Sequence, residues 1–135
     1  MTAPAGLDRD LLIVACAVSA GIHAALTPAH LTEGAAAGTA FAASAAVLAA
    51  LAIGLNLWPT PAILAVAVAV LAGLIAAFAL AVTTGVPLLH PEPEPVGGLA
   101  LFTKAVEGLG LLAATRLLRL RAGIRVPLRS KGTLA

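Results

Sequence analysis

The sequence has little charge and few aromatic rings. Only 10% of its 135 residues are charged and 3% are aromatic, whereas 61% are hydrophobic. A soluble domain is about 45–50% apolar and about 25% charged, so this composition excludes a water-soluble globule and a disordered chain. With three Phe, one Trp and no Tyr, the chain offers little surface on which nucleic-acid bases could stack, and we expect no nucleic-acid partner.

Cysteine is almost absent as well. The single residue, Cys16, excludes a disulfide scaffold, a paired redox motif and a cysteine-based zinc site. Residues 13–16 resemble a lipoprotein cleavage box, but the apolar run before the cysteine is short and the leader is not net positive. We therefore expect the first helix to be retained and Cys16 to be a small buried residue; the sequence does not decide whether Cys16 is lipidated.

Long apolar segments dominate the chain. A transmembrane helix needs about 20 mostly apolar residues, and four segments meet that requirement: about 11–27, 34–57, 62–84 and 98–118. The sequence thus predicts an all-α fold, an integral membrane four-helix bundle in the lipid bilayer. We expect one domain over residues 1–119, followed by a basic tail over residues 120–135.

Prolines and glycines suggest where the helices end. Residues 56–61 and 85–87 predict tight turns after the second and third spans. Thr27 and Pro28 match a capping hydroxyl followed by a proline at the first helical position. The first helix is therefore expected to end at Pro28, and the second helix to begin there.

Basic residues lie on one side of the predicted topology. The end of the fourth span and the tail carry six of them: Arg116, Arg119, Arg121, Arg125, Arg129 and Lys131. The loops over residues 28–33 and 86–97, on the opposite side, carry no Lys or Arg. The positive-inside rule places the tail, and with four spans also the N-terminus, in the cytoplasm. We expect the protein in the bacterial inner membrane.

Small residues recur at four-residue spacing along the second span from Gly34 to Gly54 and along the third from Ala65 to Gly85. In lipid, helices associate through close approach at small residues. The remaining spans offer further small residues: Ala17, Gly21, Ala25, Gly108 and Gly110. We predict a tightly packed bundle built on these stripes, and a homo-oligomer or a larger membrane complex.

The groups able to do chemistry gather on the side opposite the tail. Imidazole and carboxylate groups in such a cluster can bind zinc, copper or iron. The predicted metal ligands are His23, His30, Glu33 and Glu107. The neighbouring polar cluster comprises His90, Glu92, Glu94 and Lys104, and a hydrophilic loop also explains its first three members. A single haem held by two of the histidines is the lesser alternative.

The predicted ligands also have interpretations that need no metal. A hydrogen bond to a backbone carbonyl would explain His23, and a solvated first turn of the second helix would explain His30 with Glu33. Glu107 lies roughly 14 Å inside the fourth span, where an ionisable residue needs a partner. Lys104, one turn away, is the expected partner.

Several of these pieces occur together in one recognisable order. They are Ile22-His23, Pro28-Ala29-His30-Leu31-Thr32-Glu33, Gly85-Val86-Pro87, Glu92-Pro93-Glu94-Pro95-Val96-Gly97 and Glu107. Over residues 20–110 the chain resembles a family of small, uncharacterised four-helix bacterial integral membrane proteins with the pattern IH, PEHxxEW, GLP, EPEPVG and an intramembrane Glu. The chain departs from the family's usual Trp, acid, Arg and Asp at Gly34, Ala29, Val82 and Ala100. The resemblance implies the segmentation and the polar residues, and no activity.

Three functions follow as hypotheses. The first is a metal-binding membrane protein with its site at the outer face, and the second is a non-catalytic accessory or assembly subunit of a membrane complex. The third is a proton-coupled oligomeric transporter in which Glu107 titrates. The sequence has no Ser-His-Asp spacing, phosphate-binding loop or paired Glu-x-x-His motif, so we do not expect an enzyme.

Overall fold

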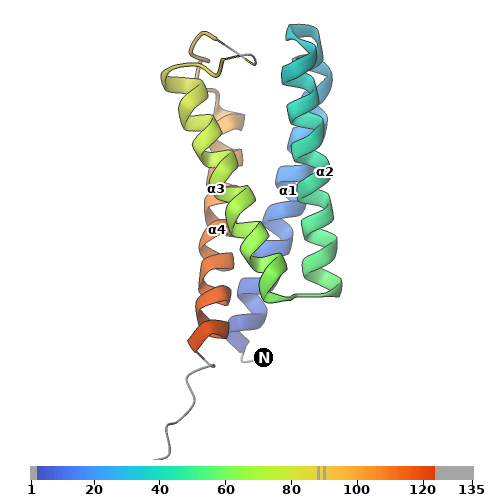
Figure 1. The fold of residues 1–135 in the computed structure, drawn as a ribbon, viewed down its shortest axis with the longest axis vertical. Helices are drawn as coiled ribbons and strands as arrows, with labels where there is room; N and C mark the ends of the chain where they lie inside the picture. The colour runs from blue at the N-terminus through green and yellow to red at the C-terminus, as the bar shows by residue number, and fades with distance from the viewer. Residues whose placement is uncertain (1–2, 88, 90, 124–135) are drawn as a thin grey trace, which may run out of the picture.

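The computed structural model describes residues 3–87, 89 and 91–123, and they form an all-α fold (Figure 1). The helices are α1 (Ala3–Glu33), α2 (Ala35–Leu57), α3 (Pro61–Thr83) and α4 (Gly98–Gly123). Each of the four is long and apolar enough to cross a membrane. The predicted fold class and the four predicted spans are confirmed at this level.

The helices run alternately up and down (Figure 1). One end, here the terminal end, holds residues 3–8, 56–61 and 118–123. The other, the cavity end, holds residues 28–38, 84–87, 89 and 91–98. α1 packs along α2 and α4, and α3 packs along α4, whereas α2 touches α3 little. The helices therefore contact one another in the order α2, α1, α4, α3. At the cavity end α1–α2 and α3–α4 stand apart as two helix pairs (Figure 1).

The predicted end of the first helix at Pro28 is wrong. α1 continues through Pro28 to Glu33, and the Thr27 hydroxyl donates back to the His23 carbonyl at 2.8 Å instead of capping a new helix. A membrane helix tolerates proline because neighbouring groups satisfy the carbonyl that loses its donor. His30 and Glu33 consequently lie on the last turn of α1, and not on the first turns of α2.

Gly38 allows the tight reversal between α1 and α2. Gly34 is extended, with φ 170° and ψ 145°, and its N–H donates to the His30 carbonyl at 3.0 Å. A side-chain carbon built at Gly38 would lie 2.8 Å from the Cα atom of Leu31, so α2 can start this close to the end of α1 only with glycine there.

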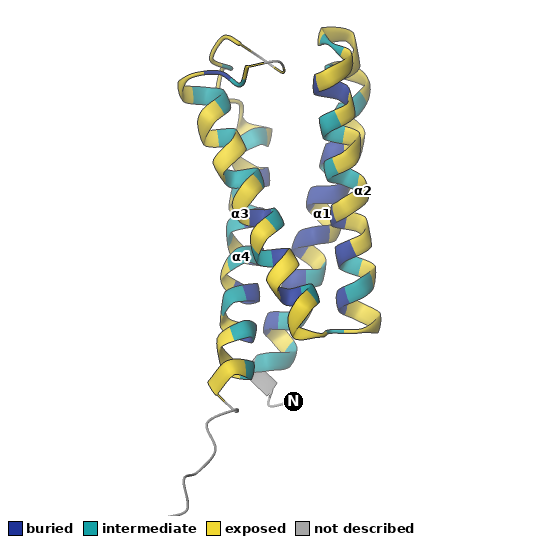
Figure 2. Cartoon of the chain, in the orientation of Figure 1, coloured by how far each residue is buried: buried dark blue, intermediate teal, exposed yellow. Residues whose placement is uncertain are grey.

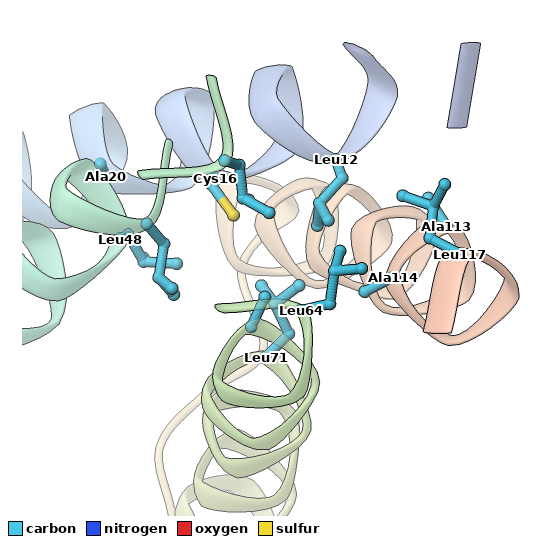
Figure 3. Packing of buried hydrophobic residues seen from close by; sticks show 12 residues of the cluster. Leu12, Cys16, Ala20, Leu48, Leu64, Leu71, Ala113, Ala114 and Leu117 are labelled. Carbon is cyan, nitrogen blue, oxygen red and sulfur yellow. The ribbon is translucent and has the colours of Figure 1, made fainter. Parts of the chain in front are cut away.

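The core combines leucines with small residues, and the predicted packing on stripes of small residues holds only at single positions. Gly38 of α2 and Gly110 of α4 approach α1 closely, whereas much of the stripes is exposed. The small residues Ala17, Gly21 and Ala25 of α1 are exposed, and so are residues 42, 46 and 50 of α2. The buried faces point between the helices in Figure 2. Figure 3 shows the cluster they form, which includes Leu12, Cys16, Leu48, Leu64, Leu71 and Leu117. Cys16 is buried, as predicted.

Two turns confirm the sequence-based expectation. Thr60 caps α3 by accepting a hydrogen bond from the Ile63 N–H at 3.3 Å, and Pro61 is the first helical residue. α3 ends at Thr83, followed by Gly85 with φ 75°, a left-handed conformation that favours glycine.

Arginines hold the loop between α2 and α3 at the terminal end. Arg9 of α1 donates to the Asn56 carbonyl at 3.3 Å, and Arg121 of α4 donates to the Pro59 carbonyl. A third basic residue, Arg116, lies 3.5 Å from a carboxylate oxygen of Asp8. α4 extends to Gly123, and the rest of the predicted basic tail lies outside the described residues.

Candidate functional site

A buried hydrogen bond joins α1 to α4 in the middle of the bundle. Ser19 and Glu107 are both 0% exposed, and the Ser19 hydroxyl donates to the Glu107 Oε1 atom at 2.7 Å. A carboxylate buried among apolar helices carries a large desolvation cost unless it is paired. The structure therefore has to supply a partner for the charge of Glu107.

Lys104 is that partner. Its Nζ atom lies 2.5 Å from Glu107 Oε2, which is the pairing that the three-residue spacing predicted. The same ammonium group is 3.5 Å from the Leu74 carbonyl oxygen and 5.5 Å from the centre of the Phe78 ring, both on α3. Lys104 thus ties the acidic residue of α4 to the neighbouring helix α3.

His23 continues this polar line along α1. Its Nδ1 atom lies 2.9 Å from the Ser19 carbonyl oxygen and 3.4 Å from the Ser19 hydroxyl. A carbonyl can only accept, so Nδ1 carries the proton, and in the neutral ring Nε2 keeps the lone pair. The interpretation of His23 as bonded to a backbone carbonyl matches this geometry, and Nε2 remains available for an exchangeable proton or a ligand.

Phe41 of α2 packs against both histidines of α1. Its ring centre lies 3.8 Å from that of His30 in a stacked arrangement, and 5.3 Å from that of His23. His30 Nδ1 also lies 2.6 Å from Glu33 Oε2. The side chain of Glu33 is 48% exposed, so this pair lies at the surface of the cavity end.

These groups surround a cavity of about 370 Å³ between the two helix pairs. All four helices and described residues of the connection between α3 and α4 contribute to its wall, which is mainly apolar. The polar residues in the wall are His23, His30, Ser44, Glu94, Thr103 and Lys104. Cavities of this size accept drug-sized ligands when they combine apolar walls with a few polar groups.

One layer of side chains closes the cavity toward the terminal end. Along the four helices the cavity wall reaches His23, Ser44, Leu74 and Lys104. The next turn toward the terminal end carries Ser19, Leu48, Leu71 and Glu107, and all four are 0% exposed. We call these four residues the closing layer. Two of its residues, Ser19 and Glu107, are joined by a hydrogen bond, and the other two, Leu48 and Leu71, are apolar.

The predicted metal ligands do not meet at one point in the described chain. Glu107 is linked to His23 through Ser19, whereas His30 pairs with Glu33 at the cavity end. Within residues 3–87, 89 and 91–123, no group of three or more His, Cys, Asp or Glu side chains could hold a metal ion. Metal binding stays a prediction.

The predicted polar cluster around residues 90–104 is divided. Glu92 is exposed, Glu94 is half-buried in the cavity wall, and Lys104 lies at the deep end of the cavity. His90 lies outside the described residues. The structure therefore brings Lys104 to Glu107 and places Glu94 at the same cavity.

Sequence reasoning missed Ser19 and Phe41. Ser19 shares a helical face with Leu12, Cys16 and His23, at spacings typical of one buried stripe, so helical periodicity was enough to find it. Phe41 comes from another helix and meets the histidines only through the α1–α2 reversal. No local pattern predicts that contact.

Comparison with known proteins finds no matching family model, no matching curated protein and no matching solved structure. The family resemblance drawn from the motifs stays a prediction, and function has to be argued from the geometry of the site.

Proposed function

We propose that this chain is a protein of the bacterial cell membrane that binds a small ligand in the cavity and couples binding to the protonation of Glu107. The observation that carries the proposal is the position of Lys104. Lys104 belongs to the cavity wall, and its ammonium group lies 2.5 Å from the fully buried Glu107 carboxylate. A ligand that binds to the Lys104 ammonium group therefore changes the electrostatic environment of Glu107.

The closing layer favours binding over passage. Ser19, Leu48, Leu71 and Glu107 are completely buried on the terminal side of the cavity. A transported molecule would have to separate these side chains, and the hydrogen bond between Ser19 and Glu107 with them. Transport by an oligomer, metal binding and an accessory role stay hypotheses, since they need further groups or partners.

We propose the orientation in which the cavity opens toward the outer side. The terminal end carries the basic residues Arg116, Arg119 and Arg121, and the cavity end lacks Lys and Arg outside the half-buried Lys104. This charge asymmetry supports a cytoplasmic terminal end. A ligand would then enter from the outer half of the membrane or from the outer solution.

Access to the cavity can be measured with adjacent residues of α2. Ser44 belongs to the cavity wall, whereas Ala43 is exposed on the outside of the bundle. In a Cys16→Ala background reconstituted in nanodiscs, Ser44→Cys should react with a water-soluble maleimide. Ala43→Cys should not, because its thiol faces lipid. Equal reaction of both thiols, or of neither, would contradict an accessible cavity.

Coupling can be measured by infrared spectroscopy of the same protein. Each carboxyl group of the protein contributes a carbonyl band when it is protonated, and the component that Glu107→Gln removes and Glu92→Gln leaves is the Glu107 band. A maleimide adduct on Ser44→Cys should shift the pH dependence of this band, whereas an adduct on Glu92→Cys should not. If the adduct on Ser44→Cys leaves the pH dependence of this band unchanged, the proposed coupling is wrong.

A further inference from the structure

We infer that the ligand of the cavity is a quinone, a neutral membrane-soluble ring with carbonyl oxygens. The inference rests on the proposed ligand-binding function and adds the chemical class of the ligand. Three properties of the cavity support it: aromatic side chains on both helix pairs, the pairing of the charges at its deep end, and the hydrogen-bonding groups there.

Aromatic rings come from both helix pairs that flank the cavity. Phe41 of α2 lies in the wall together with the imidazole rings it contacts, and Phe78 of α3 lies in the wall beside Lys104. Flat rings prefer offset-stacked or edge-to-face contact with aromatic side chains. The walls therefore suit a flat ring better than a branched or purely aliphatic molecule.

The charges of the wall favour a neutral ligand. At the deep end the Lys104 ammonium group is already paired with the Glu107 carboxylate. An anionic head there would meet the Glu107 carboxylate, and a cationic head would meet the Lys104 ammonium group. Either charge would also have to leave water for a mainly apolar wall. A neutral ligand avoids these penalties.

The deep end offers one donor and one acceptor. The Lys104 ammonium group has three N–H donors, and Glu107 Oε2 and the Leu74 carbonyl account for two of them. The remaining donor suits the carbonyl oxygen of a quinone. His23 Nδ1 donates to the Ser19 carbonyl, so Nε2 of the neutral ring is an acceptor that suits a quinol hydroxyl. One ring can thus be held in both its oxidised and its reduced form.

Binding of defined probes tests the ligand class. Decylubiquinone should raise the unfolding midpoint of the protein in nanodiscs in a saturable way. Phenyldecane keeps a ring and the tail but lacks carbonyls, and it should have no such effect. Lauric acid and dodecyltrimethylammonium, which carry opposite charges, should also fail. A rise of equal size with any of these three compounds would overturn the inference.

Phe41 and Phe102 provide matched variants. Phe102 is an exposed phenylalanine of α4 and does not belong to the cavity wall. We expect Phe41→Ala to weaken decylubiquinone binding about tenfold, and Phe41→Leu, which keeps most of the apolar volume, to weaken it as well. Phe102→Ala should leave binding unchanged. Binding that is insensitive to both Phe41 variants would place the quinone elsewhere and overturn the inference.

The failure of this inference can be distinguished from failure of the proposed function. If the Ser44→Cys adduct shifts the Glu107 band and decylubiquinone does not stabilise the protein, the cavity is a coupled binding site for another class of ligand. If the adduct has no effect, the proposed function itself is wrong. A shift of the Glu107 band by the adduct, together with stabilisation by decylubiquinone that is lost in Phe41→Leu, supports both.

Discussion

The ion pair between Lys104 and Glu107 is the interaction on which the site depends most. Glu107 is fully buried, and Lys104 holds it from one turn away on the same helix. Removing one member of a buried pair leaves the other charge without compensation, whereas replacing both members is often close to neutral. The two kinds of change should therefore have very different effects on stability.

We expect Lys104→Met to lower the free energy of unfolding by about 3–5 kcal/mol, because Glu107 is then buried without its cation. The double variant Lys104→Met/Glu107→Gln should recover most of that loss, since the amide still accepts the Ser19 hydrogen bond without a charge. Denaturant unfolding in mixed micelles measures both changes. A double variant that loses as much stability as the single one would show that charge is not the cause.

The residues of the site differ in how far the sequence reveals them. The spacing of Lys104 and Glu107 predicts a pair within one helix, because residues three apart share a helical face, and the structure confirms it. The contact between Ser19 and Glu107 joins residues 88 positions apart, so it depends on how α1 and α4 cross. Local spacing carries no information about that crossing.

The two Thr-Pro pairs of the chain show how context decides the end of a helix. At Thr60 the preceding Pro59 already excludes a helical Trp58, which has φ −139° and ψ 75°, so a turn forms and Thr60 caps α3. At Thr27 the residues before the pair are apolar helix, and the hydroxyl bonds backward to His23. The same dipeptide therefore predicts a boundary correctly once and wrongly once.

Substitutions at Thr60, which caps α3, and at Pro28, which lies inside α1, should have opposite effects on stability. Thr60→Ala removes the cap of α3 and should lower the free energy of unfolding by about 1 kcal/mol. Pro28→Ala gives α1 back a donor for the Ala24 carbonyl and should raise stability. Thermal unfolding of the two purified variants measures whether Thr60→Ala lowers the stability and Pro28→Ala raises it. A loss of stability in Pro28→Ala would show that Pro28 itself favours the native α1.

The small residues of α4 show why stripes are a weak guide to packing. A side-chain carbon at Gly110 would lie 2.9 Å from the Ala15 Cβ atom and 3.3 Å from a Leu71 methyl carbon, whereas one at Gly108 would meet nothing within 4 Å. Both glycines fit the sequence pattern equally well. They differ because Gly110 lies on the face of α4 that packs against α1, whereas Gly108 does not. Which face of α4 is buried depends on the core packing.

We therefore expect opposite effects from the same substitution. Gly110→Ala should reduce the free energy of unfolding by about 1–3 kcal/mol, because the added methyl group overpacks the α1–α4 contact. Gly108→Ala should increase it by about 0.8–1 kcal/mol through helix propensity. Unfolding of the two variants side by side is the measurement. If both substitutions stabilise the protein, the close approach of α1 and α4 is not as described.

At the scale of the whole molecule, the sequence predicted the number and class of the helices because apolar length alone determines them. It did not predict that α2 and α3 touch little, so that the two helix pairs leave a cavity at one end. The fully buried residues of the cluster reach Leu48 on α2 and Leu71 on α3, and Leu74 packs against them. Beyond this level the apolar side chains of α2 and α3 line the cavity and do not fill it.

Orientation decides which compartment supplies the ligand, and it can be measured on the loops. In a Cys16→Ala background, Trp58→Cys reports on the terminal end and Glu92→Cys on the cavity end, and both positions are exposed. A membrane-impermeant maleimide added to intact cells should label Glu92→Cys and should label Trp58→Cys only after permeabilisation. The arginines of the terminal end favour this result. The reverse labelling would turn the cavity toward the cytoplasm, and ligand would then have to enter the same closed-ended cavity from inside the cell.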